Sequence, residues 1–464
     1  MRRESVAAVV LSLLTPAVLA GPLAPPAGPV DETYKTLHQV EPRTPVNADT
    51  TPGNASALFV IDRPGSYYLE GDIQGVPARH AILIESSDVT LDLRGFSIRG
   101  VTGSLDGISA QGRSGGDVFS VVVLGDGRVF NFRNGINGAA AQRSRVENVT
   151  VTNNDAIGIL LADNATIAGC TVNANVTGGV KTGENARVEH CTVTNTPKGI
   201  GIAVGDNTLV SHCLASDCLT DGFNAGDTAR FAHCLSHGNA RDGFAAADGA
   251  SFDECTAENN NANGFNTGKD SAFRACSANA NSADGYVTDD TVVVESCMAR
   301  TNGSRGFHLG TFAVVVNSTA SGNLDDGFRT DGWSTFQQCS AIDNSANGFQ
   351  IGENSQITRC LASSNSLPGI FGFAKNLIEH NSCINHFLVP DQASIAVNGR
   401  GNRIDSNHVS TGNVGVSVSG TQNLVVRNSV HNTPVAYDIP AGNLPAPIRT
   451  SFITTVGPWD NFEH

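Results

Sequence analysis

Charged side chains recur at one fixed interval in the second half of the chain. Asp284, Arg305 and Asp326 follow one another at 21-residue intervals, and Arg329 follows His308 at the same interval. Paired carboxylates can serve as acid and base in glycoside hydrolysis, and a His or Arg side chain can remove the proton beside a uronate carboxyl group. These five residues are the predicted catalytic group.

Three residues close to this group are predicted to bind a substrate. Asp289, Asp331 and Trp333 follow the same segments by a few residues. Carboxylates accept hydrogen bonds from sugar hydroxyls, and an indole ring offers an apolar platform. A structural interpretation competes with both predictions, because Asp and Asn before Gly are ordinary turn residues.

A column of imidazoles is a third candidate. His190, His212, His233 and Glu254 each come directly before a cysteine, at intervals of 21 or 22 residues. If the coils stack ~4.8 Å apart, three imidazoles and a carboxylate could bind a transition metal. A divalent cation is the only cofactor that the sequence suggests. The alternative is a solvent-facing column without a ligand, because exposed strand positions are commonly polar.

A repeat determines the elements that must position these side chains. Glycine followed by an aromatic or aliphatic residue returns every 21 residues in the centre of the chain. This glycine column comprises Gly222, Gly243, Gly264, Gly285, Gly306, Gly327, Gly348 and Gly369. Looser copies precede it at Gly107, Gly135, Gly158, Gly179 and Gly199. A period of this length indicates a repeat architecture.

Two further columns share the period. Cysteine recurs from Cys170 to Cys360, with Ser318 in one position, and asparagine stands four residues before most of the glycines, Asn131 and Asn195 included. Both columns are predicted to point inward, as small apolar side chains and as stacked amides. Disulfides between coils are disfavoured, because stacked Cβ atoms would lie ~4.8 Å apart and because the cysteine count, 11, is odd.

Short strands are predicted to build each coil. Apolar residues alternate in runs of three or four, which is the strand period, and Gly and Asn mark the corners. Three strands and three turns close one coil, neighbouring coils pair as parallel strands, and such crossovers are right-handed in nearly all cases. The predicted fold is all-β, a single-stranded right-handed parallel β-helix with 21 residues per coil. Roughly fifteen coils would give a rod about 70 Å long.

Several segments resemble known proteins of this kind. PGSYYLEGDI, VTLDLRGFSIRG and SLDGI near the N-terminus, and NLIEHNSC, NRIDSNHV and NLVVRNSV near the C-terminus, are similar to the repeats of the pectin-lyase-like superfamily. The ending GPWDNF resembles a group of uncharacterised exported bacterial β-helix proteins. The resemblance covers most of residues 33–464.

The resemblance implies a link to extracellular carbohydrate. The superfamily includes pectate lyases, polygalacturonases, alginate epimerases, phage tailspikes and noncatalytic surface proteins, so it does not by itself establish catalysis. An enzyme of this kind would be a polysaccharide lyase, a glycoside hydrolase or a uronate epimerase. No stretch reproduces the calcium-binding acidic residues followed by a basic cluster that the lyases are expected to show, which argues against pectate-lyase activity.

The N-terminus has the pattern of a secretory signal peptide. Arg2 and Arg3 precede an apolar run from Val6 to Leu14, and small residues allow cleavage near Ala20. The predicted segments are the signal peptide 1–20, a Pro-rich linker or N-terminal strap 21–50, the β-helix with its N-terminal coils 51–440, and a C-terminal cap or tail 441–464. The mature chain is therefore expected to be secreted, periplasmic or on the cell surface, without a transmembrane segment.

The net charge limits the classes of partner that the sequence predicts. A charge of −15 argues against nucleic acid, and it suits a polyanionic polysaccharide only if a basic patch exists locally. A polysaccharide bound or processed along a lateral face is the leading hypothesis. A noncatalytic surface, structural or adhesion rod is the alternative, because residues 222–369 contain no insertion. A periplasmic metal-binding protein is a third possibility, and the oligomeric state stays open.

Overall fold

A computed structural model describes residues 42–386, 392–450 and 457–463 of the chain. The predicted signal peptide and most of the predicted strap lie outside these residues. Within the described residues, no helix is long and apolar enough to cross a bilayer.

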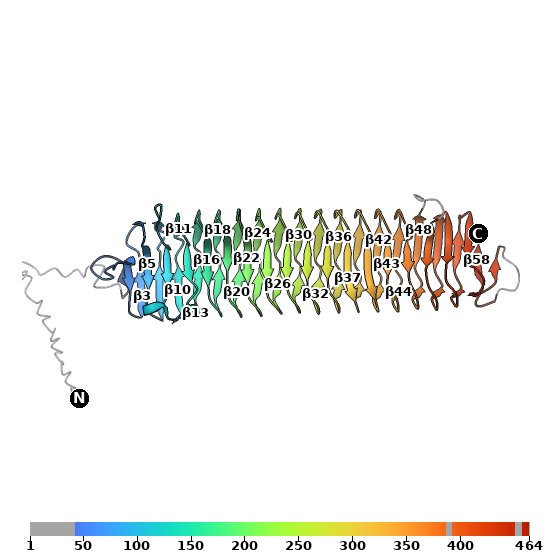
Figure 1. Cartoon of the computed structure of the whole chain (residues 1–464), viewed down its shortest axis with the longest axis horizontal. Helices are drawn as coiled ribbons and strands as arrows, with labels where there is room; N and C mark the ends of the chain where they lie inside the picture. Colours follow the sequence, from blue (N-terminus) through green and yellow to red (C-terminus); the bar gives the residue numbers. More distant parts are fainter. Residues whose placement is uncertain (1–41, 387–391, 451–456, 464) are drawn as a thin grey trace, which may run out of the picture. The chain divides into compact units, whose positions relative to one another are not determined.

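Three short strands form each coil, as the sequence predicts. In one central coil these are β25 (Phe223–Ala225), β26 (Arg230–Ala232) and β27 (Leu235–His237). The next coil begins with β28 (Phe244–Ala246), which pairs in parallel with β25 so that Phe223 lies beside Phe244. Repetition of this step stacks the coils into a solenoid (Figure 1).

The coils generate three parallel sheets, named here in their order within a coil. Sheet I runs from β2 (Ala57–Ile61) to β55 (Val435–Asp438), sheet II from β1 (Thr44–Pro45) to β56 (Leu444–Pro445), and sheet III from β4 (Ile73–Gln74) to β58 (Asn461–Glu463). Sheet II has 19 strands, so the solenoid has about nineteen coils, near the predicted fifteen. The additional coils lie towards the ends, where the 21-residue glycine signal is weak or absent.

Stacked rings fill the centre of the solenoid. Phe223, Phe244 and Phe265 of sheet I stack with centroid separations of 4.6 and 4.9 Å, while Phe231 and Phe252 of sheet II stack at 4.9 Å. The two stacks meet edge to face, for example Phe231 against Phe244 at 5.6 Å. All five rings are buried. Edge-to-face and offset rings are the favourable aromatic arrangements, so the repeat packs without large voids.

An asparagine ladder satisfies the backbone at the corner between sheets III and I. Asn281 donates from its backbone N and from Nδ2 to Asn302 Oδ1, both at 3.1 Å, and Nδ2 also reaches the Ala257 carbonyl at 3.1 Å. The same pattern runs from Asn239 to Asn365. Each amide is buried, so the ladder pairs polar groups that would be costly to leave unpaired.

The structure corrects the predicted columns near their N-terminal ends. Ile202 pairs with Phe223, so Gly201 rather than Gly199 is the equivalent of Gly222. Asn131 and Asn195 adopt left-handed corner conformations, with φ of 62° and 56°. The residue after each, Phe132 and Thr196, is therefore the one that turns inward and is buried.

The cysteine column points inward, as predicted. All eleven cysteines are buried and free. The backbone N of Cys276 donates to Cys297 Sγ at 3.4 Å, and that of Cys297 donates to Ser318 Oγ at 3.1 Å. The column therefore serves as architecture, and Ser318 replaces a thiol without breaking it.

The N-terminal coils depart from the repeat. The coil from Gly107 to Gly135 has 28 residues rather than 21. The additional residues form a short 3₁₀ helix, η1 (Arg113–Gly115), and β9 (Val118–Phe119), which pairs with β13 (Ala141–Gln142) outside the three main sheets. This departure adds structure beside sheet I, where the regular coils have none.

Candidate functional site

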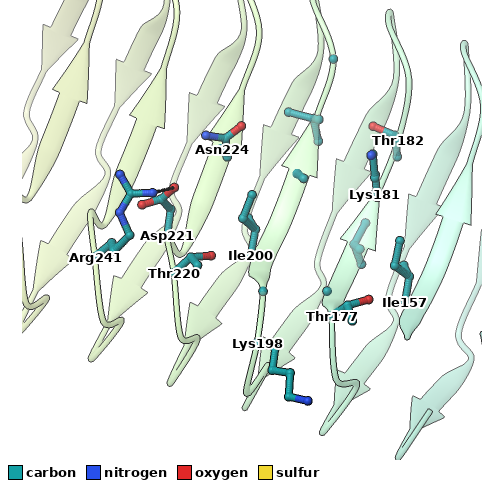
Figure 2. A pocket seen from close by; sticks show the side chains of 16 residues that line it. Ile157, Thr177, Lys181, Thr182, Lys198, Ile200, Thr220, Asp221, Asn224 and Arg241 are labelled. Atoms are coloured by element: carbon teal, nitrogen blue, oxygen red, sulfur yellow. Dashed lines mark ion pairs between the residues drawn. The ribbon is translucent and has the colours of Figure 1, made fainter. Parts of the chain in front are cut away.

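A groove lies on the outer face of sheet I, over β19 (Gly178–Lys181) and β22 (Ile200–Val204) (Figure 2). Its volume is about 580 Å³. The lining comes from five successive coils: Ile157, Thr177, Gly178, Val180, Lys181, Thr182, Lys198, Gly199, Ile200, Ala203, Val204, Gly205, Thr220, Asp221, Asn224 and Arg241. We call it the Lys181 groove.

Small residues hollow out this part of the sheet. Along the outward row, Lys181 pairs with Ala203, and Ala203 pairs with Asn224. The methyl group of Ala203 leaves open space between the two longer side chains. Gly199 permits the close turn beside it, since a Cβ there would lie 1.8 Å from the Thr177 carbonyl oxygen. The coil from Gly179 to Gly201 has 22 residues, one more than the regular repeat.

A second hollow of about 310 Å³ adjoins the first and shares Lys181 and Thr182 with it. Its far wall includes Asp117 and Gln142, which belong to the irregular N-terminal coils. The two hollows together cross six coil spacings, or ~29 Å along the axis of the solenoid. Residues at the additional structure around β9 therefore line one end of the second hollow.

Positive charge is concentrated in the Lys181 groove. Lys181, Lys198 and Arg241 line the larger hollow, and Asp221 is the carboxylate opposite them. The Arg241 Nη1 atom lies 3.8 Å from Asp221 Oδ2, an ion pair drawn as a dashed line in Figure 2. Asp221 is only 4% exposed, and burial raises the pKa of its carboxyl group. The buried acid orients Arg241, whereas Lys181 and Lys198 form no ion pair with any of the described residues.

The structure brings together three of the five predicted catalytic residues. His308 Nδ1 lies 3.5 Å from Asp284 Oδ2 and 3.0 Å from Arg305 Nη1. Arg305 also approaches Asp325 Oδ2 at 3.3 Å. Burial alone would raise the pKa of Asp284, but contacts with His308, Ser304 and Arg305 outweigh burial and hold that pKa below its usual range. The result is a closed ion cluster on sheet I that lines neither hollow.

Arg329 lies next to this cluster, whereas Asp326 is buried. Arg329 pairs with His308 in the strand register between β37 (Phe307–Thr311) and β40 (Phe328–Gly332). Asp326 is 2% exposed and accepts bonds from the backbone and side chain of Asn347 at 2.9 and 2.8 Å. Burial raises the pKa of Asp326. Its position fits the turn interpretation better than contact with a substrate.

The predicted substrate-binding residues lie at the corner between sheets I and II. Asp289, Asp331 and Trp333 are all exposed. Trp333 has a neighbour that the sequence did not single out: the Phe312 ring lies one coil away, with a centroid separation of 6.0 Å and an interplanar angle of 27°. The two rings form an open aromatic surface.

The predicted histidine column is present, and its imidazole rings stack on one another. The rings of His190 and His212 lie 4.8 Å apart with an interplanar angle of 6°, and those of His212 and His233 are also 4.8 Å apart. His233 Nδ1 approaches Glu254 Oε2 at 3.2 Å. Across the described residues, no group of three His, Cys, Asp or Glu side chains is arranged to hold a metal ion. The metal site at this column stays a prediction.

The residues of the Lys181 groove escaped the sequence prediction for one reason. They differ in type from coil to coil, and the coil from Gly179 to Gly201 has 22 residues, so the cationic side chains form no column of one residue type at the 21-residue interval. One signal was present, because lysine occurs only five times in the chain and two of the five are Lys181 and Lys198.

Comparison with known proteins supports the architecture. A family model described as "Right handed beta helix region" matches residues 73–213 and 134–274. A search of curated proteins found no match. Among solved structures, the A-module of the Azotobacter vinelandii mannuronan C-5 epimerase AlgE4 is 13% identical, with 78% of this chain and 90% of that chain covered and a TM-score of 0.36.

A tailspike protein of Escherichia coli bacteriophage HK620 is 11% identical, with 83% of this chain and 73% of that chain covered and a TM-score of 0.33. The assignment of the fold rests on the strand register and the family model rather than on these distant similarities. Continuous parallel pairing over three sheets gives the parallel β-helix, and the family model describes a right-handed one. The chain folds as a right-handed parallel β-helix.

Proposed function

We propose that this chain is an exported protein that binds an extracellular polysaccharide carrying acidic groups, along the Lys181 groove. The observation that carries the proposal is the placement of Lys181, Lys198 and Arg241 in one groove of a chain with a net charge of −15. Such a local reversal of charge favours an anionic ligand and disfavours approach by the same ligand elsewhere.

The direction of the groove favours a polymer over a small molecule. The groove crosses successive strands of sheet I, so an extended chain lying in it would contact several coils in turn. Threonine, asparagine and backbone groups lie between the cationic side chains and suit sugar hydroxyls. The proposal is one of binding, because Asp221 is 4% exposed and engaged with Arg241.

Neutralising the groove tests the proposal. The Lys181→Ala/Lys198→Ala double variant should bind an acidic polysaccharide about tenfold more weakly, since two charged contacts of about 0.7 kcal/mol each add up to the roughly 1.4 kcal/mol of a tenfold change. The Lys269→Ala/Lys375→Ala variant is the matched control, because it removes the same charge from outside the groove. Binding is measured on a glycan array and then by calorimetry at two salt concentrations.

Equal losses in the two double variants would contradict a specific groove, and so would an array on which no acidic polysaccharide binds. Wild-type binding should also weaken as the salt concentration rises, because the lysines are open to solvent.

A noncatalytic structural or adhesion rod is the second candidate. It is favoured by the unbroken asparagine ladder from Asn239 to Asn365 and by coils of constant length over the same region. The glycan array separates the two candidates, since a purely structural rod predicts no binding that depends on Lys181 and Lys198.

A further inference from the structure

An aromatic surface remains on the face that the groove does not use. Phe312 and Trp333 are 52% and 58% exposed, although large aromatic side chains are usually mostly buried. Both residues occupy corner positions with left-handed backbone, φ of 60° and 54°, which turns their side chains away from the core. Exposed apolar surface of this kind commonly marks a place where a ligand or partner binds.

The two rings form one apolar surface, called here the platform. Their centroids are 6.0 Å apart and their planes differ by 27°, so the rings stack on each other. Val314, 40% exposed on sheet II, extends the apolar surface beside them. The C–H groups on one face of a pyranose ring are apolar and weakly positive, which suits the negative face of an aromatic ring.

The polar surroundings select the kind of sugar. Asp289, Asp290, Asp331 and Glu353 lie in the same corner within one coil of the rings, whereas the lysines of this corner, Lys269 and Lys375, lie two coils away. Thr311 donates to Asp290 from N at 2.9 Å and from Oγ1 at 2.8 Å, which lowers the pKa of that carboxyl group. The platform therefore lies in negative potential and would repel a uronate.

Hydrogen-bond acceptors remain available beside the rings. Within the described part of the chain, the carboxylates of Asp289 and Asp331 accept no hydrogen bond and form no ion pair. Each can accept hydrogen bonds from sugar hydroxyls. Apolar rings flanked by free acceptors are the arrangement that a hydroxylated ring without charge would need.

We propose that the Phe312–Trp333 platform is a separate subsite for an uncharged hexopyranose. The proposal rests on the proposed function for the view that the ligand is a polysaccharide, and it deepens that function. The natural ligand would then combine acidic units, held in the Lys181 groove, with neutral units stacked on the platform.

The chain's two tryptophans allow a direct test. Trp459 lies under Arg427, with the guanidinium carbon 5.0 Å from the ring centroid, and Trp459→Phe keeps a ring there while leaving Trp333 as the only indole. Neutral hexasaccharides of glucose, mannose and galactose are titrated into this variant. At least one should change the Trp333 fluorescence in a saturable way, whereas hexasaccharides of uronic acids should not.

Single substitutions test whether the neutral sugar binds at the platform. Phe312→Ala should lower the affinity for the neutral hexasaccharide by about tenfold. Trp333→Phe should retain most of that affinity, as measured by calorimetry. Phe373→Ala is the matched control, since it removes another exposed ring at the same corner, and it should leave binding unchanged. The Lys181→Ala/Lys198→Ala variant should also leave neutral-sugar binding unchanged.

The outcomes separate the two proposals. Saturable neutral-sugar binding without groove binding would overturn only the proposed function. Lysine-dependent binding of acidic polysaccharide, with no fluorescence response to any of the three neutral hexasaccharides, would overturn only the platform. Self-association that Trp333→Ala abolishes, measured by sedimentation in the absence of sugar response, would show a protein interface instead and also overturn the platform.

Discussion

At the scale of single residues, one column of the repeat shows how environment decides the behaviour of a carboxyl group. Asp221, Asp284 and Asp326 occupy equivalent positions before the column glycines. Burial raises the pKa of Asp221 and of Asp326, whereas contacts with His308, Ser304 and Arg305 lower that of Asp284. Equivalent positions in the repeat therefore carry carboxyl groups whose pKa values are shifted in opposite directions.

The raised pKa of Asp326 predicts a stabilising substitution. A carboxyl group whose folded pKa is raised favours folding below its unfolded pKa, and loses that contribution as pH rises through the folded pKa. Asp326→Asn keeps an acceptor for Asn347 and removes the ionisation, so it should raise the urea midpoint at pH 7. The gain should disappear near pH 3, below the unfolded value of about 3.9.

Asp405 provides a control in which the same substitution should change stability in the opposite direction. The carboxyl group is buried and bonded by Arg403 and Arg427, whose contacts outweigh burial and lower its pKa to about 2. Its contribution is present above the unfolded pKa and is lost as pH falls through about 2. Asp405→Asn should therefore lower the urea midpoint at pH 7 and have less effect near pH 2. The same sign for both variants at pH 7 would contradict the account.

Part of the candidate site could be predicted at this scale. The 21-residue interval correctly places His308 next to Arg329 and brings Asp284, Arg305 and His308 together. The interval carries no information on depth or on side-chain partners, so it did not show that Asp326 is buried. Nor could it reveal Lys181, Lys198 and Arg241, which line one groove but do not share one column of the repeat.

At the scale of the elements, side-chain ladders hold the coils in register. Each inward asparagine bonds the next coil through two donors, and each aromatic ring stacks on its neighbour. At Asn131 and Asn195 a left-handed backbone displaces the inward position by one residue, to Phe132 and Thr196. The columns could be recognised from sequence where the coil length is constant and were misplaced where it changes.

Removing one asparagine of the ladder should lower the free energy of unfolding. Asn281→Ala leaves the Asn260 backbone N and amide, at 3.1 and 2.9 Å from Asn281 Oδ1, without their acceptor. We expect a loss of about 1–3 kcal/mol in the free energy of unfolding. Asn261→Ala, at an exposed corner, is the matched control and should change stability by less than about 0.5 kcal/mol. Urea denaturation at pH 7 measures both, and equal effects would argue against the ladder as a source of stability.

At the scale of the whole molecule, the sequence predicts the architecture well and the location of the groove poorly. A strict period defines strands, corners and core because every coil contacts only its neighbours. The Lys181 groove lies beside departures from that period, namely the additional residues around β9 and the longer coil before Gly201. The period itself does not predict where such a groove lies.

The central claim is that an acidic polysaccharide lies in the Lys181 groove, and lysine labelling tests it most directly. The described residues contain four lysines, Lys181, Lys198, Lys269 and Lys375. Reductive methylation of the wild-type protein, with and without a saturating acidic polysaccharide, is quantified for each lysine by mass spectrometry. The account predicts that the ligand protects Lys181 and Lys198 while Lys269 and Lys375 remain reactive. Equal labelling of all four lysines in the presence of bound polysaccharide would contradict it.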